Sequence, residues 1–253
     1  PLPVQGLLSE AMAAVILMTG TLKFTGRLSL QAQGKGAVSL LLAEATDDGT
    51  LRGLAHHTEL PTSDAISEQP RLPALLGQQG IMAITIRPQR GQQYQGVVPL
   101  EGDNLAACLE HYFHQSEQLP TRLWLTGGNG RAAGLMLQRL PDQLASNEQN
   151  QQLWQHLCTL ADTVTFEELL DLSAVEVLHR LFHETPPELT APQPIRFQCS
   201  CSRDKVSQTL RSLGRAELQA ILDEQGEITV SCDFCASEEV FDAVDLDQLI
   251  HQL

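Results

Sequence analysis

Four of the six cysteines form two short motifs in the last third of the 253-residue chain. Cys199-Ser200-Cys201 and Cys232-Asp233-Phe234-Cys235 are separated by the thirty residues 202–231. A CxxC turn points two sulfur atoms at one ion, and a second pair completes a tetrahedral thiolate site, for which zinc is the favoured metal. Four protein ligands leave no open position for a catalytic water, so we expect one zinc ion in a structural or regulatory role.

The same cysteines have other interpretations. Structural disulfides are disfavoured in a reducing cytosol, and an iron–sulfur cluster is the remaining alternative. Zinc holds its cysteines as thiolates, the form that peroxide and hypochlorous acid attack. Structural zinc contributes about 10–16 kcal/mol to folding, so oxidation of its ligands would remove about a whole domain's stability. We therefore hypothesise that the cluster is a redox switch whose oxidation unfolds a small unit.

No other residue pattern indicates catalysis. Cys108 and Cys158 fall on apolar helix faces, where a thiol packs as a small hydrophobic group. His179 and His183 are four residues apart but lack the carboxylate of an HExxH motif, which favours a solvated or packed pair. Gly127–Gly130 lacks the ending of a P-loop and indicates a hairpin turn. We expect no catalytic residues and no enzyme activity.

The elements that must position the cysteines form three predicted parts, and the predicted class is α+β. Residues 1–141 are expected to form a mixed α/β core domain with antiparallel sheets. Its helices are predicted at Leu7–Met18 and from Asp103 to Pro120. The strand-like runs are Leu28–Gln33, Ala37–Ala43, Leu51–His56, Ile81–Arg87, Gln93–Leu100, Arg122–Thr126 and Ala132–Leu137. Hairpin signals at Gly34–Gly36, Asp47–Gly49 and Gly127–Gly130 join several of them.

Residues 142–192 are expected to form an acidic helical linker. It holds nine acidic side chains and one basic one, Arg180. A helix is predicted at Asn150–Ala161, and two S/T-x-x-E capping boxes follow, Thr165 with Glu168 and Ser173 with Glu176. The apolar face predicted for the last linker helix consists of Val175, Leu178, Leu181 and Phe182. Because like charges repel, we expect marginal stability, although an ordinary solvated acidic face is equally consistent.

Residues 193–253 are predicted to form a small zinc-binding domain. Strands are expected at Ile195–Gln198 and Glu227–Ser231, and helices at Asp204–Leu213, at Ala216–Asp223 and from Asp245. About sixty residues give a thin core, which usually needs a metal or a disulfide to hold it together.

Charge and hydropathy exclude several partners. The net charge is −15, and residues 141–253 hold 20 acidic but only 6 basic side chains, whereas a nucleic-acid binder needs the opposite sign. The most apolar stretch, Ala11–Leu22, is predicted to be a buried helix too short to span a membrane. The basic start and cleavage site of a signal peptide are absent, so we expect a cytoplasmic location.

The cysteine spacing and several other stretches resemble the bacterial thirty-three-kilodalton heat-shock chaperone family, the redox-regulated holdases. The resemblance extends over nearly the whole chain, and the CxC…CxxC pair at this spacing is specific. The matching stretches are Thr21–Gly26, Tyr94–Val98, Leu100–Asp103, Leu105–Glu110, Ser116–Arg122, Cys199–Arg203, Gly226–Ile228 and Cys232–Cys235. Members of this family carry a further helical and strand segment before the position of Pro1, so we expect residues to precede it.

The resemblance implies an ATP-independent holdase that is inactive when reduced and zinc-bound. It implies that oxidation joins Cys199 to Cys201 and Cys232 to Cys235, expels zinc and unfolds the linker. The activated protein would bind unfolding client proteins and form a homodimer. From the residues alone two alternatives stay open: a constitutively folded zinc-ribbon interaction module, and a thiol oxidoreductase that uses Cys199 or Cys235.

Overall fold

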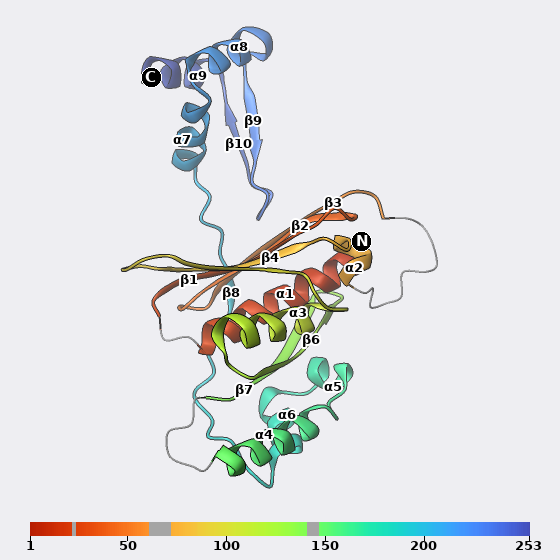
Figure 1. Ribbon diagram of the computed structural model, residues 1–253. Coiled ribbons are helices and arrows are strands. Elements are labelled where there is room, and N and C mark those ends of the chain that lie inside the picture. The colour runs from red at the N-terminus through yellow and green to blue at the C-terminus, as the bar shows by residue number, and fades with distance from the viewer. Residues whose placement is uncertain (22–23, 61–71, 141–146) are drawn as a thin grey trace. The chain divides into compact units, whose positions relative to one another are not determined.

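The computed structural model describes residues 1–21, 24–60, 72–140 and 147–253 (Figure 1). Leu22, Lys23 and the start of the predicted linker at 141–146 lie outside the described residues. The predicted α+β class with antiparallel sheets is confirmed. By its internal contacts the chain divides into two compact units, Pro1–Phe197 and Gln198–Leu253. The division into core, linker and zinc domain stays a prediction.

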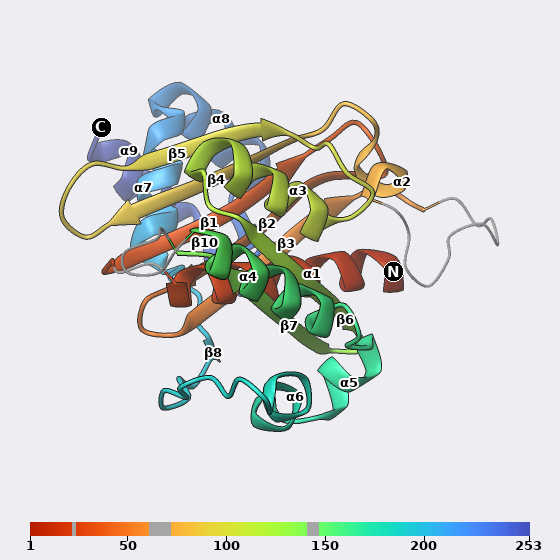
Figure 2. The same ribbon diagram turned by 60° about the horizontal axis from the view of Figure 1, so that its bottom comes forward.

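The first unit is built on a six-stranded sheet in the order β5-β4-β1-β2-β3-β8 (Figure 2). Its strands are β1 (Gly26–Gln33), β2 (Val38–Thr46), β3 (Thr50–His57), β4 (Ile81–Pro88), β5 (Tyr94–Pro99) and β8 (Arg196–Phe197). The five long strands pair with one another in antiparallel fashion, and Leu30 of β1 lies opposite both Ala43 and Ile84. The predicted turns at Gly34–Gly36 and Asp47–Gly49 join β1 to β2 and β2 to β3, as expected.

Helix α1 (Leu2–Thr21) lies between this sheet and a separate hairpin of β6 (Thr121–Gly128) and β7 (Arg131–Gln138). Ala11, Ala14 and Val15 are completely buried because the helix packs on both layers. The hairpin approaches it closely: a Cβ at Gly127 would lie 2.2 Å from the Cβ of Ser9.

The prediction that no apolar run is long enough to span a membrane was wrong. Helix α1 has 20 residues and is long and apolar enough to cross a membrane by length and composition alone. The predicted apolar run, Ala11–Leu22, was shorter than the helix because Gly6, Ser9 and Glu10 interrupt the apolar residues of the first half of α1. Its contacts are nevertheless those of a core helix, as the sequence predicted.

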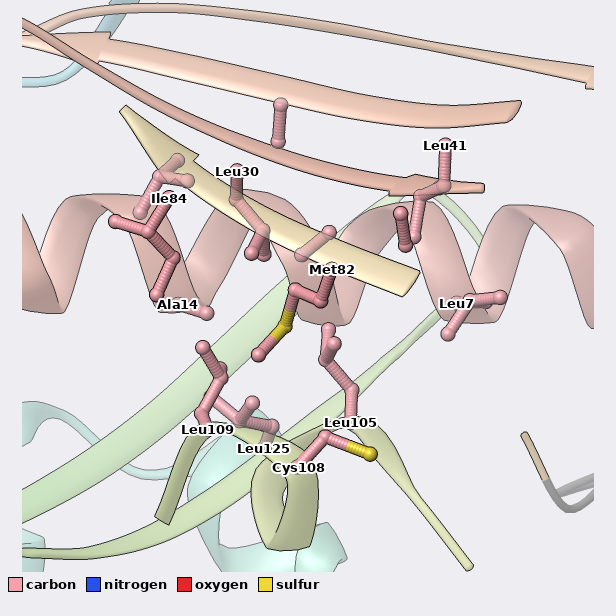
Figure 3. Packing of buried hydrophobic residues seen from close by; sticks show 14 of the residues in the cluster. Leu7, Ala14, Leu30, Leu41, Met82, Ile84, Leu105, Cys108, Leu109 and Leu125 are labelled. Carbon is pink, nitrogen blue, oxygen red and sulfur yellow. The ribbon is translucent and has the colours of Figure 1, made fainter. Parts of the chain in front are cut away.

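The core of this unit is filled from the sheet, α1 and α3 (Leu105–Tyr112) (Figure 3). Leu30, Met82 and Ile84 point from the sheet into this core, where Leu105 and Leu109 meet them from α3. The cap of α3 is Asn104, whose side chain accepts from the Ala107 N–H, so the helix starts later than the predicted Asp103. Helix α3 continues into a π-helical turn, Phe113–Glu117, which closes on Gln118 at φ 54°.

Three linker helices, α4 (Asn147–Ala161), α5 (Phe166–Asp171) and α6 (Ala174–Phe182), follow the hairpin. Both predicted capping boxes are present, at Thr165 with Glu168 and at Ser173 with Glu176. Figure 1 shows these helices on the side of the β6–β7 hairpin away from the six-stranded sheet. Their buried side chains Ala161, Leu169, Val177, Leu181 and Phe182 form one cluster with Trp124, Ala133, Leu135 and Leu137 of the hairpin.

The predicted apolar face of α6 needs one correction. Val175 is 59% exposed, whereas Val177 is 6% exposed and packs in the cluster with Leu181 and Phe182. The helix begins at Ala174, as the capping box predicts, and Val175 lies about 200° around its axis from Val177, so it faces away from the hairpin. The face that α6 packs against the hairpin is therefore formed by Val177 and Leu181, which are four residues apart.

A short helix, α2 (Leu72–Leu76), lies between β3 and β4 and was not predicted. The predicted strand at Ile195–Gln198 is β8, which belongs to the first unit because it pairs in parallel with Thr50 and Leu51 of β3. The Arg196 side chain forms an ion pair with Asp48, 2.7 Å apart, which fixes β8 beside the β2–β3 turn.

The second unit has three helices and one hairpin. They are α7 (Arg203–Leu213), α8 (Arg215–Gln225), β9 (Ile228–Ser231), β10 (Glu238–Phe241) and α9 (Ala243–His251). The strand β10 was not predicted. The six buried side chains of this unit, Leu210, Leu218, Phe241, Leu246, Leu249 and Ile250, form a core much smaller than that of the first unit.

Candidate metal centre

The CxC motif lies in an extended segment that ends at the start of α7. Ser202, directly after Cys201, is the N-cap residue of this helix, and its hydroxyl accepts a hydrogen bond from the Lys205 N–H. The Lys205 ammonium group donates to the carbonyl oxygen of Ser200, inside the motif. The helix start therefore holds Cys199 and Cys201 in place through the residues between and after them.

The CxxC motif forms the turn between β9 and β10. The Cys232 N–H donates to the carbonyl of Ser237 over 2.9 Å, and the Ala236 N–H donates back to the carbonyl of Cys232 over 2.7 Å. Ala236 takes the left-handed conformation, φ 54°, which closes the turn. Cys232 and Cys235 are thereby fixed on one side of a rigid hairpin end.

The fold brings all four sulfur atoms of the two motifs together. They lie within 4.8 Å of one another, with Sγ–Sγ distances of 3.6 Å between Cys199 and Cys232 and 3.4 Å between Cys201 and Cys235. In a tetrahedral site with metal–sulfur distances of about 2.3 Å, the sulfur atoms are about 3.8 Å apart. The cysteines are not joined in disulfides. The arrangement thus fits a four-thiolate site for one metal ion.

The thiol pKa values diverge within this cluster. The Ser237 hydroxyl, the Ser237 N–H and the nearby Cys201 lower the pKa of Cys235 to about 6. Ser237 also acts to lower the pKa of Cys201, but the contacts with Cys235 and Cys199 outweigh it and raise that pKa to about 11. Two close thiols that share one proton behave in this way. The cluster therefore carries thiolate character at neutral pH.

Arg203 connects the CxC segment to the rest of the second unit. Its guanidinium group donates to the Val240 carbonyl over 2.7 Å and to the Asp245 carboxylate over 2.5 Å. It also lies over the Phe241 ring, 4.1 Å from the ring centre to Cζ. Because β10 begins one residue after Ser237, this side chain connects both halves of the cluster through the core of the unit.

The other candidate residues do not join the cluster. Cys108 and Cys158 are buried in the first unit, and burial raises the pKa of Cys108 to about 11, as expected for a packed thiol. His179 and His183 are both exposed, with ring centres 6.3 Å apart. Sequence reasoning missed Ser237 and the role of Arg203, because a serine two residues after a CxxC motif gives no signal by itself.

Comparison with known proteins supports the same grouping. The Hsp33 protein family model matches residues 1–242. A 33 kDa chaperonin of Pseudomonas paraeruginosa is 49% identical over 251 residues, which are 98% of this chain and 83% of the relative. A 33 kDa chaperonin of Neisseria meningitidis is 44% identical over 249 residues, 98% of this chain and 80% of the relative.

A solved structure has the same fold. The crystal structure of the 33 kDa chaperonin from Thermotoga maritima, a heat shock protein 33 homologue, matches with a TM-score of 0.83 and covers 98% of this chain and 86% of its own. Its sequence is 23% identical, so this likeness concerns the fold alone. The resemblance seen in the sequence is confirmed by the family match and the closely related sequences: the chain belongs to the Hsp33 family.

Proposed function

We propose that this chain is a redox-switched, ATP-independent holdase, inactive when reduced and zinc-bound and active after oxidation. Membership of the Hsp33 family makes it a chaperone, and this family is not a class of enzymes. Chaperones of such a family bind unfolded client proteins. We propose the cytoplasm as its location, because four thiolates persist as metal ligands in a reducing compartment.

The observation that carries the proposal is the convergence of four sulfur atoms in a unit with a small core. Cys199 and Cys201 come from the segment before α7, and Cys232 and Cys235 come from the β9–β10 turn. Bound zinc would hold these sulfurs as thiolates and join the two segments. With six buried hydrophobic side chains, the second unit depends on that connection for stability.

Oxidation would break the connection between the segments. A thiolate attacks one oxygen of hydrogen peroxide, forming an S–O bond and breaking the O–O bond with release of hydroxide. The neighbouring thiolate then attacks the oxidised sulfur, forms the disulfide and displaces a second hydroxide. Each disulfide thus transfers two electrons from two thiolates to one peroxide, and the two hydroxides take up two protons to become two waters. Two peroxides consume the four thiolates, and disulfide sulfurs no longer bind the ion.

We propose that the disulfides form within the motifs, Cys199 with Cys201 and Cys232 with Cys235, as the family resemblance implies. In the structure, Sγ–Sγ contacts of 3.6 Å and 3.4 Å also join the two motifs, Cys199 to Cys232 and Cys201 to Cys235. Disulfides across the motifs would keep the segments tied together. Only pairing within the motifs separates them, which is what a switch based on unfolding requires.

The linker helices supply the surface that opening would expose. They cover Trp124, Ala133, Leu135 and Leu137 of the β6–β7 hairpin with their own apolar side chains. Their attachment is partly electrostatic, since Arg131 pairs with Asp171 at 2.7 Å and Arg122 with Asp162 at 2.8 Å. Release of these helices would expose apolar side chains both on the helices and on the hairpin, and unfolding client proteins could bind there. A second copy of the chain could bind the same surface, and we propose that the activated protein is a homodimer.

The test is a comparison of the same full chain before and after oxidation. The reduced, zinc-loaded chain is treated with hydrogen peroxide at elevated temperature, and zinc release is followed with a chromophoric chelator. In parallel, light scattering reports the aggregation of a chemically denatured test enzyme. We expect suppression of aggregation to appear together with zinc release and to disappear after thiol reduction. Peptide mapping by mass spectrometry identifies the disulfide pairs.

The control is a Cys108→Ala, Cys158→Ala double variant, which should switch as the parent chain does. A constitutively folded zinc-ribbon module would behave oppositely and lose binding on oxidation. That outcome, or zinc release without any gain in suppression, would exclude the holdase proposal.

A further inference from the structure

The Ser237 hydroxyl contacts one sulfur from each cysteine motif. Its Oγ lies 3.2 Å from Sγ of Cys235 and 3.4 Å from Sγ of Cys201. These two sulfurs are themselves 3.4 Å apart, so the hydroxyl and the two sulfurs form a compact triangle at the solvent-facing side of the cluster. Ser237 is thus a side chain outside the four cysteines that contacts two sulfurs of the cluster.

The backbone fixes the position of this hydroxyl. The Ser237 carbonyl accepts from the Cys232 N–H over 2.9 Å, and the residue stands directly before β10. The left-handed Ala236 turns the chain back, so the Ser237 side chain returns to the sulfur of Cys235, two residues earlier. The hydroxyl is therefore placed by the same hairpin that places Cys232 and Cys235.

The direction of the hydrogen bonds depends on the state of the sulfurs. A protonated Cys235 donates its S–H to the Ser237 oxygen. A metal-bound thiolate has no proton, and a hydroxyl is both donor and acceptor, so in the loaded site the Ser237 O–H must be the donor. Outer groups that donate to metal ligands orient them and change metal affinity, typically by about 10–100-fold on removal.

We propose that Ser237 is a positioning residue of the metal centre that strengthens metal binding and slows oxidation of Cys201 and Cys235. This inference rests on the proposed function of the site. Four thiolates around one divalent ion carry a net negative charge, in a chain that is itself strongly acidic. The hydroxyl withdraws part of that charge by hydrogen bonding, which makes the thiolate a weaker nucleophile toward the peroxide oxygen. Ser237 thus sets how much oxidant the switch tolerates before it opens.

The test uses the whole 253-residue chain with Ser237→Ala. Zinc affinity is measured by competition with a chelator, and we expect it to fall about tenfold. Zinc release under a fixed peroxide concentration should be faster than in the parent chain. In the cobalt-substituted protein, the sulfur-to-cobalt charge-transfer band should move to lower energy, because a thiolate that loses a hydrogen bond becomes a better electron donor.

Two matched variants separate this role from general destabilisation of the hairpin. Ser237→Thr keeps the hydroxyl and should restore parental values. Ser231→Ala removes a hydroxyl from the same hairpin whose hydrogen bond, in the part of the chain that the structure describes, goes to Glu238 at 3.5 Å, and it should change none of the three measurements. Parental values in Ser237→Ala, or equal losses in Ser231→Ala, would overturn the proposal. A parent chain that binds no zinc would instead reject the proposed function itself.

Discussion

The side chain of Glu10, in helix α1, ends in a carboxyl group that is largely shielded from water. It lines a cavity of about 410 Å³ together with Asp103, Glu110 and Arg122. Arg122 is engaged with Glu110 at 3.3 Å and with Asp162 at 2.8 Å, so its charge is shared with other acids. Burial removes water from the Glu10 carboxylate and raises its pKa to about 7.

The raised pKa predicts a pH-dependent stability of the first unit. Between about pH 4.5 and 7 the folded state holds a proton on Glu10 that the unfolded state releases, so the free energy of unfolding falls as pH rises. Above pH 7 the free energy of unfolding is lower by the full amount, about 3 kcal/mol. Glu10→Gln should therefore stabilise the unit at pH 8 and have little effect at pH 4.

Urea unfolding of the reduced, zinc-loaded chain at several pH values measures this effect. Glu59→Gln, a change at an exposed carboxyl, is the control and should leave the pH profile unchanged. A profile in Glu10→Gln that parallels the parent's between pH 5 and 8 would contradict the assignment.

Single residues differ in how far the sequence reveals them. The four clustered cysteines were predictable, because their chemistry is rare and their spacing alone limits how they can be used. Ser237 and Arg203 were not, because serine and arginine are common surface residues whose contacts exist only once the hairpin and α7 are folded. Even the inert cysteines were predictable, since their helices carry an apolar pattern.

At the scale of elements, α6 makes a sharp test of the linker. Val177 is buried against the hairpin cluster, and Val175, two residues earlier on the same helix, is exposed. Val177→Ser should weaken the attachment of the linker helices by about 2–3 kcal/mol, because it leaves a cavity and buries a hydroxyl. Val175→Ser should change little.

Hydrogen exchange of the amides in 166–182 in the reduced, zinc-loaded chain reports this difference. We expect faster exchange in Val177→Ser and a lower peroxide dose for activation, with Val175→Ser matching the parent. Equal exchange in the two variants would show that the α6 face does not hold the linker on the hairpin.

The elements themselves were predictable where local chemistry decides them. Turn residues and alternating apolar side chains gave the strands β1 to β7, and the capping boxes gave α5 and α6. Helix α2 is too short to show periodicity, and β10 is half acidic, so neither had a pattern to detect. The pairing of β8 with β3 joins segments some 146 residues apart, which no local pattern encodes.

At the scale of the whole molecule, the two units differ in what stabilises them. The first has a continuous core drawn from the six-stranded sheet, α1, α3 and the hairpin, and no buried member of that core comes from 198–253. The second has a core of six buried residues in 56 residues and the cysteine cluster. The part of the first unit that ends with β7, residues 1–138, is here called the body. Stability of the second unit should therefore depend on metal, whereas stability of the body should not.

Removal of metal without oxidation tests this division. In the reduced chain, a strong zinc chelator should abolish protease resistance in 198–253, because the loss of about 10 kcal/mol or more exceeds what a small core supplies. The main calorimetric transition of the body should persist at its original temperature. Re-addition of zinc under reducing conditions should restore the lost resistance. A body transition that moves with the chelator would mean that the metal site supports the whole chain, and a second unit that stays resistant would mean that its core suffices alone.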